Sequence, residues 1–208
     1  MKKLILMIIA VLFVVSISRA QENRSDFRDR FQLGLKAGVN YSNVYDAQGE
    51  EFHADPKFGL AAGIFFAIPI GRYIGIQPEV LFSQKGFKAT GKILGNSYDF
   101  TRTTNYLDIP ILLQVKPIEF LTLLAGPQFS YLMKQKDEFA NATMEQEFQN
   151  ENIRKNILCI LGGVDINLSH LVLGARLGWD IKNNNGDGTS TTPRYKNVWY
   201  QATLGFRF

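Results

Sequence analysis

Apolar and polar residues alternate one by one along eight stretches of this sequence. In residues 171–181 the leucines, Trp179 and Ile181 stand at odd positions, while Arg176, Asp180 and two glycines stand at even positions. Side chains of a β-strand alternate between two faces, so this period of two indicates a strand with one apolar face. A helix would scatter the leucines around its surface. The same alternation recurs over residues 31–41, 58–68, 74–83, 106–115, 121–131, 158–167 and 198–208.

The connections between these segments alternate in length. Long polar connections are expected at residues 42–56, 84–104, 134–156 and 183–197, and short ones at 69–72, 116–117 and 168–170. Transmembrane barrels have short turns on the periplasmic side and long loops on the outside. The segments are also long enough for tilted strands that cross a bilayer, which need about 9–11 residues.

Strands can span hydrocarbon only as a closed sheet, because the bilayer offers no partner to the backbone groups of a free edge. The sequence therefore predicts an all-β fold: an eight-stranded antiparallel up-and-down transmembrane β-barrel with short periplasmic turns and long extracellular loops. The alternative is a secreted soluble barrel with its apolar face turned inward, as in lipocalins. Against it, aromatic residues gather near the segment ends, as expected of interfacial girdles. These residues are Phe31, Tyr41, Tyr73, Phe82, Tyr106, Tyr131, Trp179, Tyr200 and Phe208.

The first twenty residues have the features of an export signal. Lys2 and Lys3 precede the apolar run 4–15, which is shorter than the ~20 residues that a membrane-spanning helix needs. Ser18 and Ala20 form a small-x-small cleavage site. An uncleaved membrane anchor is the alternative. We expect a cleaved signal peptide at residues 1–20, a polar periplasmic segment at 21–30 and an outer-membrane barrel domain at 31–208.

Charge and cysteine content exclude some classes of protein. The chain has 23 basic and 19 acidic residues, and the expected signal peptide holds three of the basic ones and none of the acidic ones. The remainder is therefore nearly neutral, and its charge does not indicate nucleic-acid binding. The single cysteine, Cys159, excludes an intrachain disulfide. The apolar runs after residue 20 are too short or too interrupted for a spanning helix.

Three motifs carry a resemblance to a known family. Residues 106–113 (YLDIPILL), 77–86 (QPEVLFSQKG) and 126–131 (GPQFSY) resemble, in that order along the chain, motifs of the PorT-like outer-membrane β-barrel proteins of the Bacteroidota. The resemblance covers essentially the whole chain after the expected signal peptide. It implies an outer-membrane barrel and not one particular function, because members are mostly recognised by the barrel alone. The founding member is implicated in the export and attachment of surface proteins.

The last strand is similar to the signal that the barrel assembly machinery reads. Phe208 is the final residue, and Tyr200 and Phe206 precede it on the same strand face. We therefore expect this machinery to be a partner during biogenesis. Outer-membrane lipid is the second expected partner.

The inward face of the predicted barrel is rich in charged side chains. An eight-stranded barrel is just wide enough for side chains to fill it. Opposite charges in such a space are expected to pair, because an unpaired buried charge is costly. The sequence therefore predicts a side-chain plug, and a narrow polar conduit is the alternative. The predicted network consists of Lys36, Glu79, Asp108, Asp165, Arg176, Asp180 and Arg207, with Gln77, Gln114 and Gln128 beside it.

Candidate catalytic and metal-binding residues are few. A lipid-modifying barrel enzyme needs a nucleophile and a base at one membrane level. Only His53, in the first long connection, and His170, in a short turn, provide imidazoles, so His53 would have to approach an outer-rim serine. Candidate serines are Ser42, Ser83 and Ser130. Two histidines and one cysteine do not suit a transition-metal site, and no motif indicates a cofactor.

Three functional hypotheses follow. The first is a non-catalytic surface barrel whose long loops, or whose 21–30 segment, bind a protein partner. The second is a small porin-like channel for ions or small solutes. The third is an outer-membrane lipid-modifying enzyme. The first is favoured, because the inward charges can be matched and the histidines are poorly placed.

Overall fold

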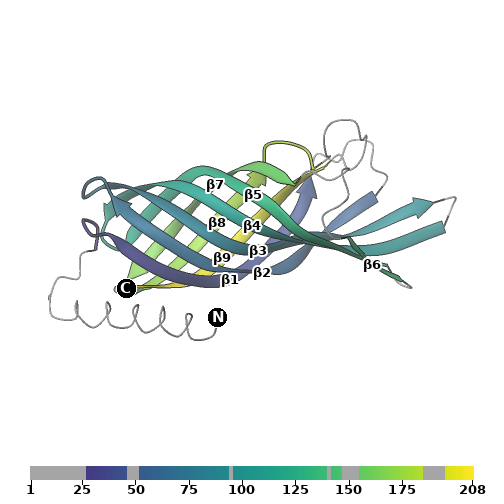
Figure 1. Cartoon of the computed structure of the whole chain (residues 1–208), viewed down its shortest axis with the longest axis horizontal. Helices are drawn as coiled ribbons and strands as arrows, with labels where there is room; N and C mark the ends of the chain where they lie inside the picture. The colour runs from purple at the N-terminus through teal and green to yellow at the C-terminus, as the bar shows by residue number, and fades with distance from the viewer. Residues whose placement is uncertain (1–26, 46–51, 94–95, 140–141, 147–154, 185–194) are drawn as a thin grey trace.

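The protein, seen in a computed structural model, is a closed β-barrel with strands that project from one end (Figure 1). The structure describes residues 27–45, 52–93, 96–139, 142–146, 155–184 and 195–208. Within them the strands are β1 (Gln32–Tyr45), β2 (Phe52–Pro69), β3 (Ile74–Ile93), β4 (Asn96–Ile118), β5 (Leu121–Phe139), β6 (Ala142–Gln146), β7 (Asn156–Leu168), β8 (Leu171–Asp180) and β9 (Lys196–Arg207). No helix long and apolar enough to cross a membrane is found in this part of the chain.

Eight strands close the barrel, and all pair antiparallel with their neighbours. The order β4-β3-β2-β1-β9-β8-β7-β5 is closed by pairing between β4 and β5, and the short β6 pairs with β5 outside this ring. The first and last strands meet along twelve residue pairs, from Gly34 opposite Arg207 to Tyr45 opposite Lys196. The predicted eight-stranded antiparallel barrel is confirmed.

The alternation in the sequence corresponds to the two faces of the barrel wall. Along β8, Leu171 and Leu173 are exposed, whereas Val172, Arg176 and Asp180 between and after them are buried. A protein in water would not keep so many large apolar side chains on its outer surface, and a lipid-facing wall requires them. The apolar face of this barrel therefore points outward, whereas that of a soluble barrel points inward.

The expected long connections are, to a large extent, strands. We predicted a loop at 84–104, yet β3 continues to Ile93 and β4 begins at Asn96, and they stay paired from Gln84 opposite Asn105 outward. Likewise β5 runs on to Phe139 and then pairs with β6, so much of the predicted loop 134–156 is sheet. We call these projecting parts, residues 52–57, 84–93, 96–105, 134–139 and 142–146, the outer sheet.

The opposite end carries the short connections, and we call it the turn end. Two of the three turns lie where they were predicted, at residues 70–73 and 169–170. The third was placed at Lys116–Pro117, but β4 continues through a bulge to Ile118 and turns at 119–120. In the 169–170 turn, Ser169 has a φ of 54°, a left-handed conformation that a two-residue hairpin requires.

Residues 27–30, which we call the N-terminal segment, cover the turn end. Arg28 is buried, and its backbone oxygen accepts a 3.1 Å hydrogen bond from the Lys116 ammonium. The Phe27 ring lies 4.4 Å from the Arg207 guanidinium and 5.5 Å from the His170 ring. We predicted a polar periplasmic segment over 21–30; within it Phe27 and Arg28 pack against the barrel, and 21–26 lie outside the described part of the chain.

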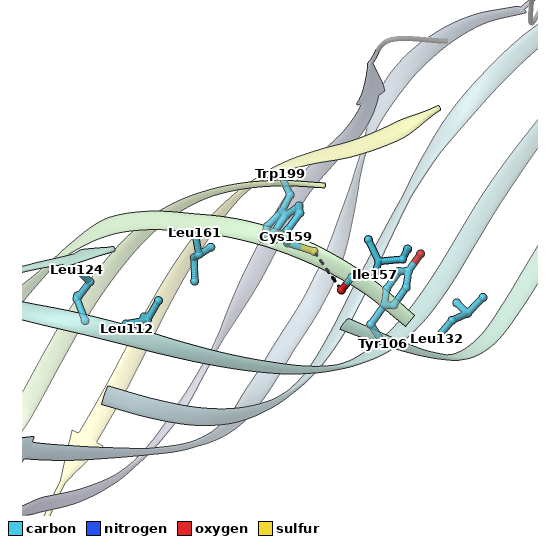
Figure 2. Packing of buried hydrophobic residues seen from close by; sticks show 8 residues of the cluster. All are labelled: Tyr106, Leu112, Leu124, Leu132, Ile157, Cys159, Leu161 and Trp199. Carbon is cyan, nitrogen blue, oxygen red and sulfur yellow. Dashed lines mark hydrogen bonds between the residues drawn. The ribbon is translucent and has the colours of Figure 1, made fainter. Parts of the chain in front are cut away.

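An apolar cluster lies inside the barrel, with members on β4, β5, β7 and β9 (Figure 2). Trp199, Leu112, Leu161 and Cys159 are almost fully buried there, together with Ile157. Tyr106 belongs to this cluster, with only 3% of its surface exposed, so its assignment to the aromatic girdle was wrong. It stands on the inward-facing register of β4, alongside Asp108 and Leu112, and therefore cannot reach lipid.

Candidate functional site: the barrel interior and its two ends

Four charged side chains meet midway through the barrel. Arg176 of β8 donates to Asp165 of β7 at 2.5 and 3.1 Å and lies 3.5 Å from Glu79 of β3. Lys36 of β1 pairs with the other oxygen of Glu79, and Gln77 donates to Glu79 at 2.6 Å. Two cations and two carboxylates therefore balance each other in a group whose members all have side chains less than 10% exposed. We call this group the central ion cluster.

A second ion pair lies where the wall meets the outer sheet. The Lys85 ammonium is 3.0 Å from the Asp108 carboxylate and 3.6 Å from the centre of the Trp199 ring. The Tyr106 ring is 4.9 Å away on another side. An ammonium held by one carboxylate and two aromatic faces has its charge fully compensated without water.

Asp180 has no cation within ion-pairing distance among the described residues, and amide groups satisfy it instead. One carboxylate oxygen accepts the backbone and side-chain amides of Asn197, at 2.9 and 2.7 Å, and the side-chain amide of Asn184 at 3.2 Å. The other accepts the Cys159 thiol at 3.1 Å. This arrangement ties the end of β8 to the start of β9.

Arg207 lies at the turn end, away from the central ion cluster. Its guanidinium donates to Gln32 at 2.9 Å, to Asn167 at 3.2 Å and to the Ser169 backbone oxygen at 2.6 Å. Gln32 in turn donates to the Phe27 backbone oxygen. Arg207 thus links the last strand, the first strand, the β7–β8 turn and the N-terminal segment.

The seven side chains predicted as one network occupy four places. The structure brings together Lys36, Glu79, Asp165 and Arg176, and it sets Asp108, Asp180 and Arg207 apart. Prediction missed Lys85, because we ended its strand at Ser83. The alternation Gln77, Glu79, Ser83, Lys85 could have shown that the strand continues.

Little space remains inside the wall. A cavity of about 20 Å³ lies at the turn end between the N-terminal segment, Gln77, Gln114 and Lys116. A second, of about 10 Å³, lies beside Lys36, Phe65 and Arg176. Cavities of this size have room for about one water each. The two cavities share Phe65, Gln77, Asp165 and Val172 in their linings, so they are neighbours in the interior.

The outer mouth is covered by a second small core. Phe87 and Ala89 of β3 pack against Tyr195, with Val44 and Phe100 around them. Arg102 donates to both oxygens of Asp137 at 2.7 Å and to the Tyr195 hydroxyl at 2.9 Å. Burial raises the pKa of the Tyr195 phenol, which the Arg102 cation opposes. These packed and paired side chains hold the base of the outer sheet against Tyr195 at the mouth.

The candidate serines for catalysis face the barrel interior. Ser42 both accepts from and donates to the Gly86 backbone, at 2.9 Å each. Ser83 accepts from Asn40 at 3.0 Å, and Ser130 accepts from Gln128 at 3.0 Å. The His53 side chain lies outside what the structure describes. In the described part of the chain, no group of three or more His, Cys, Asp or Glu side chains could hold a metal ion.

The three aromatic side chains of the proposed assembly signal lie on the outer surface. Tyr200, Phe206 and Phe208 are 60%, 45% and 37% exposed. Phe206 packs against Phe208, with ring centres 5.4 Å apart, and stacks on His170 at 5.7 Å. All three form part of the lipid-facing wall: Phe206 and Phe208 lie at the turn end, and Tyr200 lies farther along β9 toward the loop end, opposite Tyr41.

Three solved structures of bacterial proteins are similar to this chain. Neisserial surface protein A is 11% identical over 85% of this chain and 97% of that chain, with a TM-score of 0.51. Ail, the attachment invasion locus protein of Yersinia pestis, is 14% identical over 85% and 98%, with a TM-score of 0.49. OprG of Pseudomonas aeruginosa is 13% identical over 87% and 97%, with a TM-score of 0.44. At these identities the likeness concerns the fold alone.

Among curated proteins, no relative matches the chain. A family model does match, over residues 19–185, and its description is outer membrane protein beta-barrel domain. The match covers most of the chain and agrees with the apolar wall, the closed ring of strands and the asymmetric ends. The chain therefore belongs to the outer membrane protein beta-barrel domain family and is an integral protein of the outer membrane.

Proposed function

We propose that this protein is a non-catalytic, non-conducting surface barrel whose outer sheet binds a protein partner. The observation that carries the proposal is the outer sheet itself. Strands β3 and β4 stay paired for about ten residues beyond Phe82 and Leu107, the last large apolar residues on their lipid-facing sides. A barrel that served only to cross the membrane would not need this folded projection.

The side chains inside the wall favour this proposal over a channel. Permeation would have to break the Arg176–Asp165 pair and the Lys85–Asp108 pair, and both are buried. Breaking buried pairs leaves uncompensated charges in a low-dielectric space, which is costly. The Phe87–Tyr195 contact and Phe27 cover the two ends. A filled barrel with a rigid outer projection is suited to presenting a surface.

We extend the proposal to the export and assembly of the protein and to the group of the family to which it belongs. We propose that residues 1–20 are a cleaved signal peptide; they lie outside the described part of the chain. We also propose that Tyr200, Phe206 and Phe208 are read by the barrel assembly machinery, which their exposed positions would permit. Membership of the PorT-like group of the Bacteroidota rests on the motifs at 77–86, 106–113 and 126–131.

Site-specific photo-crosslinking in cells tests the binding role. A photoreactive residue at Thr101 or Thr103, partly exposed on the outer sheet, is expected to give a discrete crosslinked product. The matched control is the same residue at Leu173, which is 43% exposed on the lipid-facing wall. Products from Leu173 but none from the outer sheet, in protein that is folded and inserted, would contradict the proposal.

A further inference from the structure

Each of the three sequence motifs, at 77–86, 106–113 and 126–131, holds a proline inside a strand of the barrel wall. They are Pro78 of β3, Pro110 of β4 and Pro127 of β5. A proline nitrogen carries no hydrogen, so in sheets proline is confined to edge strands, first strand positions and bulges. The wall is a closed ring, and none of the register shifts between its described strands falls at these prolines. We call the three residues the proline line.

The proline line interrupts three neighbouring ladders of hydrogen bonds. The unpaired positions are 66–67 with 77–78 between β2 and β3, 79–80 with 109–110 between β3 and β4, and 111–112 with 126–127 between β4 and β5. Each gap contains one proline, and the register is the same on both sides of it. Because 78 and 79 are consecutive, as are 110 and 111, the gaps lie end to end across the wall.

The interruption is confined to one side of the barrel. The β1–β2, β1–β9, β5–β7, β7–β8 and β8–β9 ladders are paired at every position from their first described pair to their last. The three interrupted ladders are those that continue over many pairs into the outer sheet, whose projecting strands Figure 1 shows. The wall is therefore least strongly bonded directly beneath the outer sheet.

The proline line lies near the middle of the lipid-facing wall. On β3 the exposed apolar side chains run from Ile74 to Phe82, and Pro78 is the midpoint of that stretch. Hydrocarbon offers no donor that could replace a missing ladder bond from outside. The gaps therefore carry a cost that crossing the membrane does not require, and departures of this kind are expected where they serve a function.

We propose that the proline line is a hinge at which the outer sheet changes its tilt relative to the turn end. Ladder bonds hold neighbouring strands in register, so a wall that lacks them on three adjoining ladders bends there first. The proline rings fix their own φ, and the bending falls on the residues beside them. Above the line, β3 is paired with β4 at every position from Leu81 to Ile93, so the sheet moves as one body. Its use, to adapt the angle of the sheet to a partner, rests on the proposed function.

Distances between pairs of spin labels, measured on the folded barrel in nanodiscs, test the hinge. A label at Thr101 reports on the outer sheet, and a label at Leu173 reports on β8, whose ladders are complete. Thr101 lies nine residues outward from Pro110, about 30 Å along the strand, so a tilt of about 10° displaces it by roughly 5 Å. The control pair is Leu113 with Leu173, because Leu113 stands on the turn-end side of the line.

The variant P78A/P110A/P127A restores the three backbone N–H groups. The variant P69A/P117A is the matched control, because it replaces prolines of β2 and β4 that lie outside the line. Heat-dependent gel mobility verifies that each variant is folded. P110A alone, at the centre of the line, serves where the triple variant does not fold.

We expect the Thr101–Leu173 distances to be spread more widely in the wild type than in the triple variant, by about 5 Å. The Leu113–Leu173 distances are expected to be spread equally in both. An equal spread of the Thr101–Leu173 distances would overturn the hinge, and a shifted mean with an unchanged spread would identify a fixed kink instead. The same narrowing in P69A/P117A would overturn the assignment to the proline line. The measurement needs no partner, so its result is independent of the protein-binding role.

Discussion

At the scale of single residues, the interior is held by charges that balance within small groups. Arg176 lies between Asp165 and Glu79, and Lys36 neutralises the second oxygen of Glu79. A buried charge that loses its partner costs more than the pair contributes, because it remains desolvated. We therefore expect that removing one charge of the central ion cluster destabilises the protein more than removing one charge of each sign.

Substitution of Arg176 by methionine leaves Asp165 without a cation, and also the carboxylate oxygen of Glu79 that faces Arg176. We expect R176M to lower the free energy of unfolding by about 3–5 kcal/mol. The double variant D165L/R176M removes one charge of each sign and is expected to recover most of that loss. Urea unfolding in phospholipid vesicles measures both. A double variant no more stable than R176M would show that charge balance does not explain how the cluster stabilises the protein.

Gly86 lies where the barrel wall becomes the outer sheet. Its φ is 153°, and an added Cβ would come within 2.1 Å of the Arg102 backbone oxygen. We expect G86A to destabilise the protein by about 1–3 kcal/mol, since the backbone must shift. The control is G71A, where nothing lies within 4 Å of the added Cβ. Similar urea midpoints for the two variants would contradict this reading of the junction.

At the scale of elements, the two ends of the barrel are closed by different means. The N-terminal segment closes the turn end through Phe27 and Arg28, and the outer sheet closes the loop end through Phe87 and Tyr195. Each closure joins strands that are distant in sequence. Each can therefore be tested separately.

Removal of the Phe27 ring tests the turn-end closure. The ring covers the Arg207 guanidinium at 4.4 Å, so F27A loses a cation–π contact and apolar packing. We expect a loss of about 1–2 kcal/mol in unfolding free energy. D29A, at an exposed neighbour, is expected to change it by less than about 0.5 kcal/mol. If both variants behave alike, the segment is not packed as described.

The change of the unfolding free energy with pH in the alkaline range tests the loop-end closure. Burial raises the pKa of Tyr195, so the folded protein keeps this proton at pH values where the unfolded chain releases it. Its contribution is therefore complete below about pH 10 and falls as the pH rises toward the folded pKa. We expect the stability advantage of the wild type over Y195F to shrink between pH 8 and pH 11. A constant or growing advantage would contradict a buried phenol.

The period-two pattern predicted the barrel wall correctly, because lipid requires an apolar outward face on every strand. It failed beyond the membrane, where the requirement reverses. In the outer sheet the apolar residues, such as Phe87, Ala89 and Phe100, point inward, and Lys88 and Thr101 point outward. Because the apolar residues stand on the opposite face there, the prediction ended the strands near Ser83 and Tyr106.

The interior partners were harder to predict than the wall. Inward positions could be assigned from the alternation, but pairing depends on the height of each residue in the barrel. That height is set by the stagger between strands, which the sequence pattern does not contain. Hence Arg176 was grouped with Arg207, although they lie in different layers. The packing of Arg28 against the barrel carried no recognisable signal, because the segment is polar.

At the scale of the whole molecule, a closed barrel carries the outer sheet at one end (Figure 1). Its interior holds buried ion pairs and the apolar cluster around Trp199, and packed side chains lie at both ends. Beside these groups the interior contains two cavities, of about 20 Å³ and about 10 Å³. We therefore propose that the barrel does not conduct ions.

Conductance of residues 21–208, refolded and inserted in a planar bilayer, tests this claim most directly. Heat-dependent gel mobility must first show that the inserted protein is folded. We predict no discrete current steps at physiological salt, because the central ion cluster and both closures block the axis. Reproducible single-channel steps from the folded wild type, with a conductance altered in D165L/R176M, would contradict the account and identify a small channel.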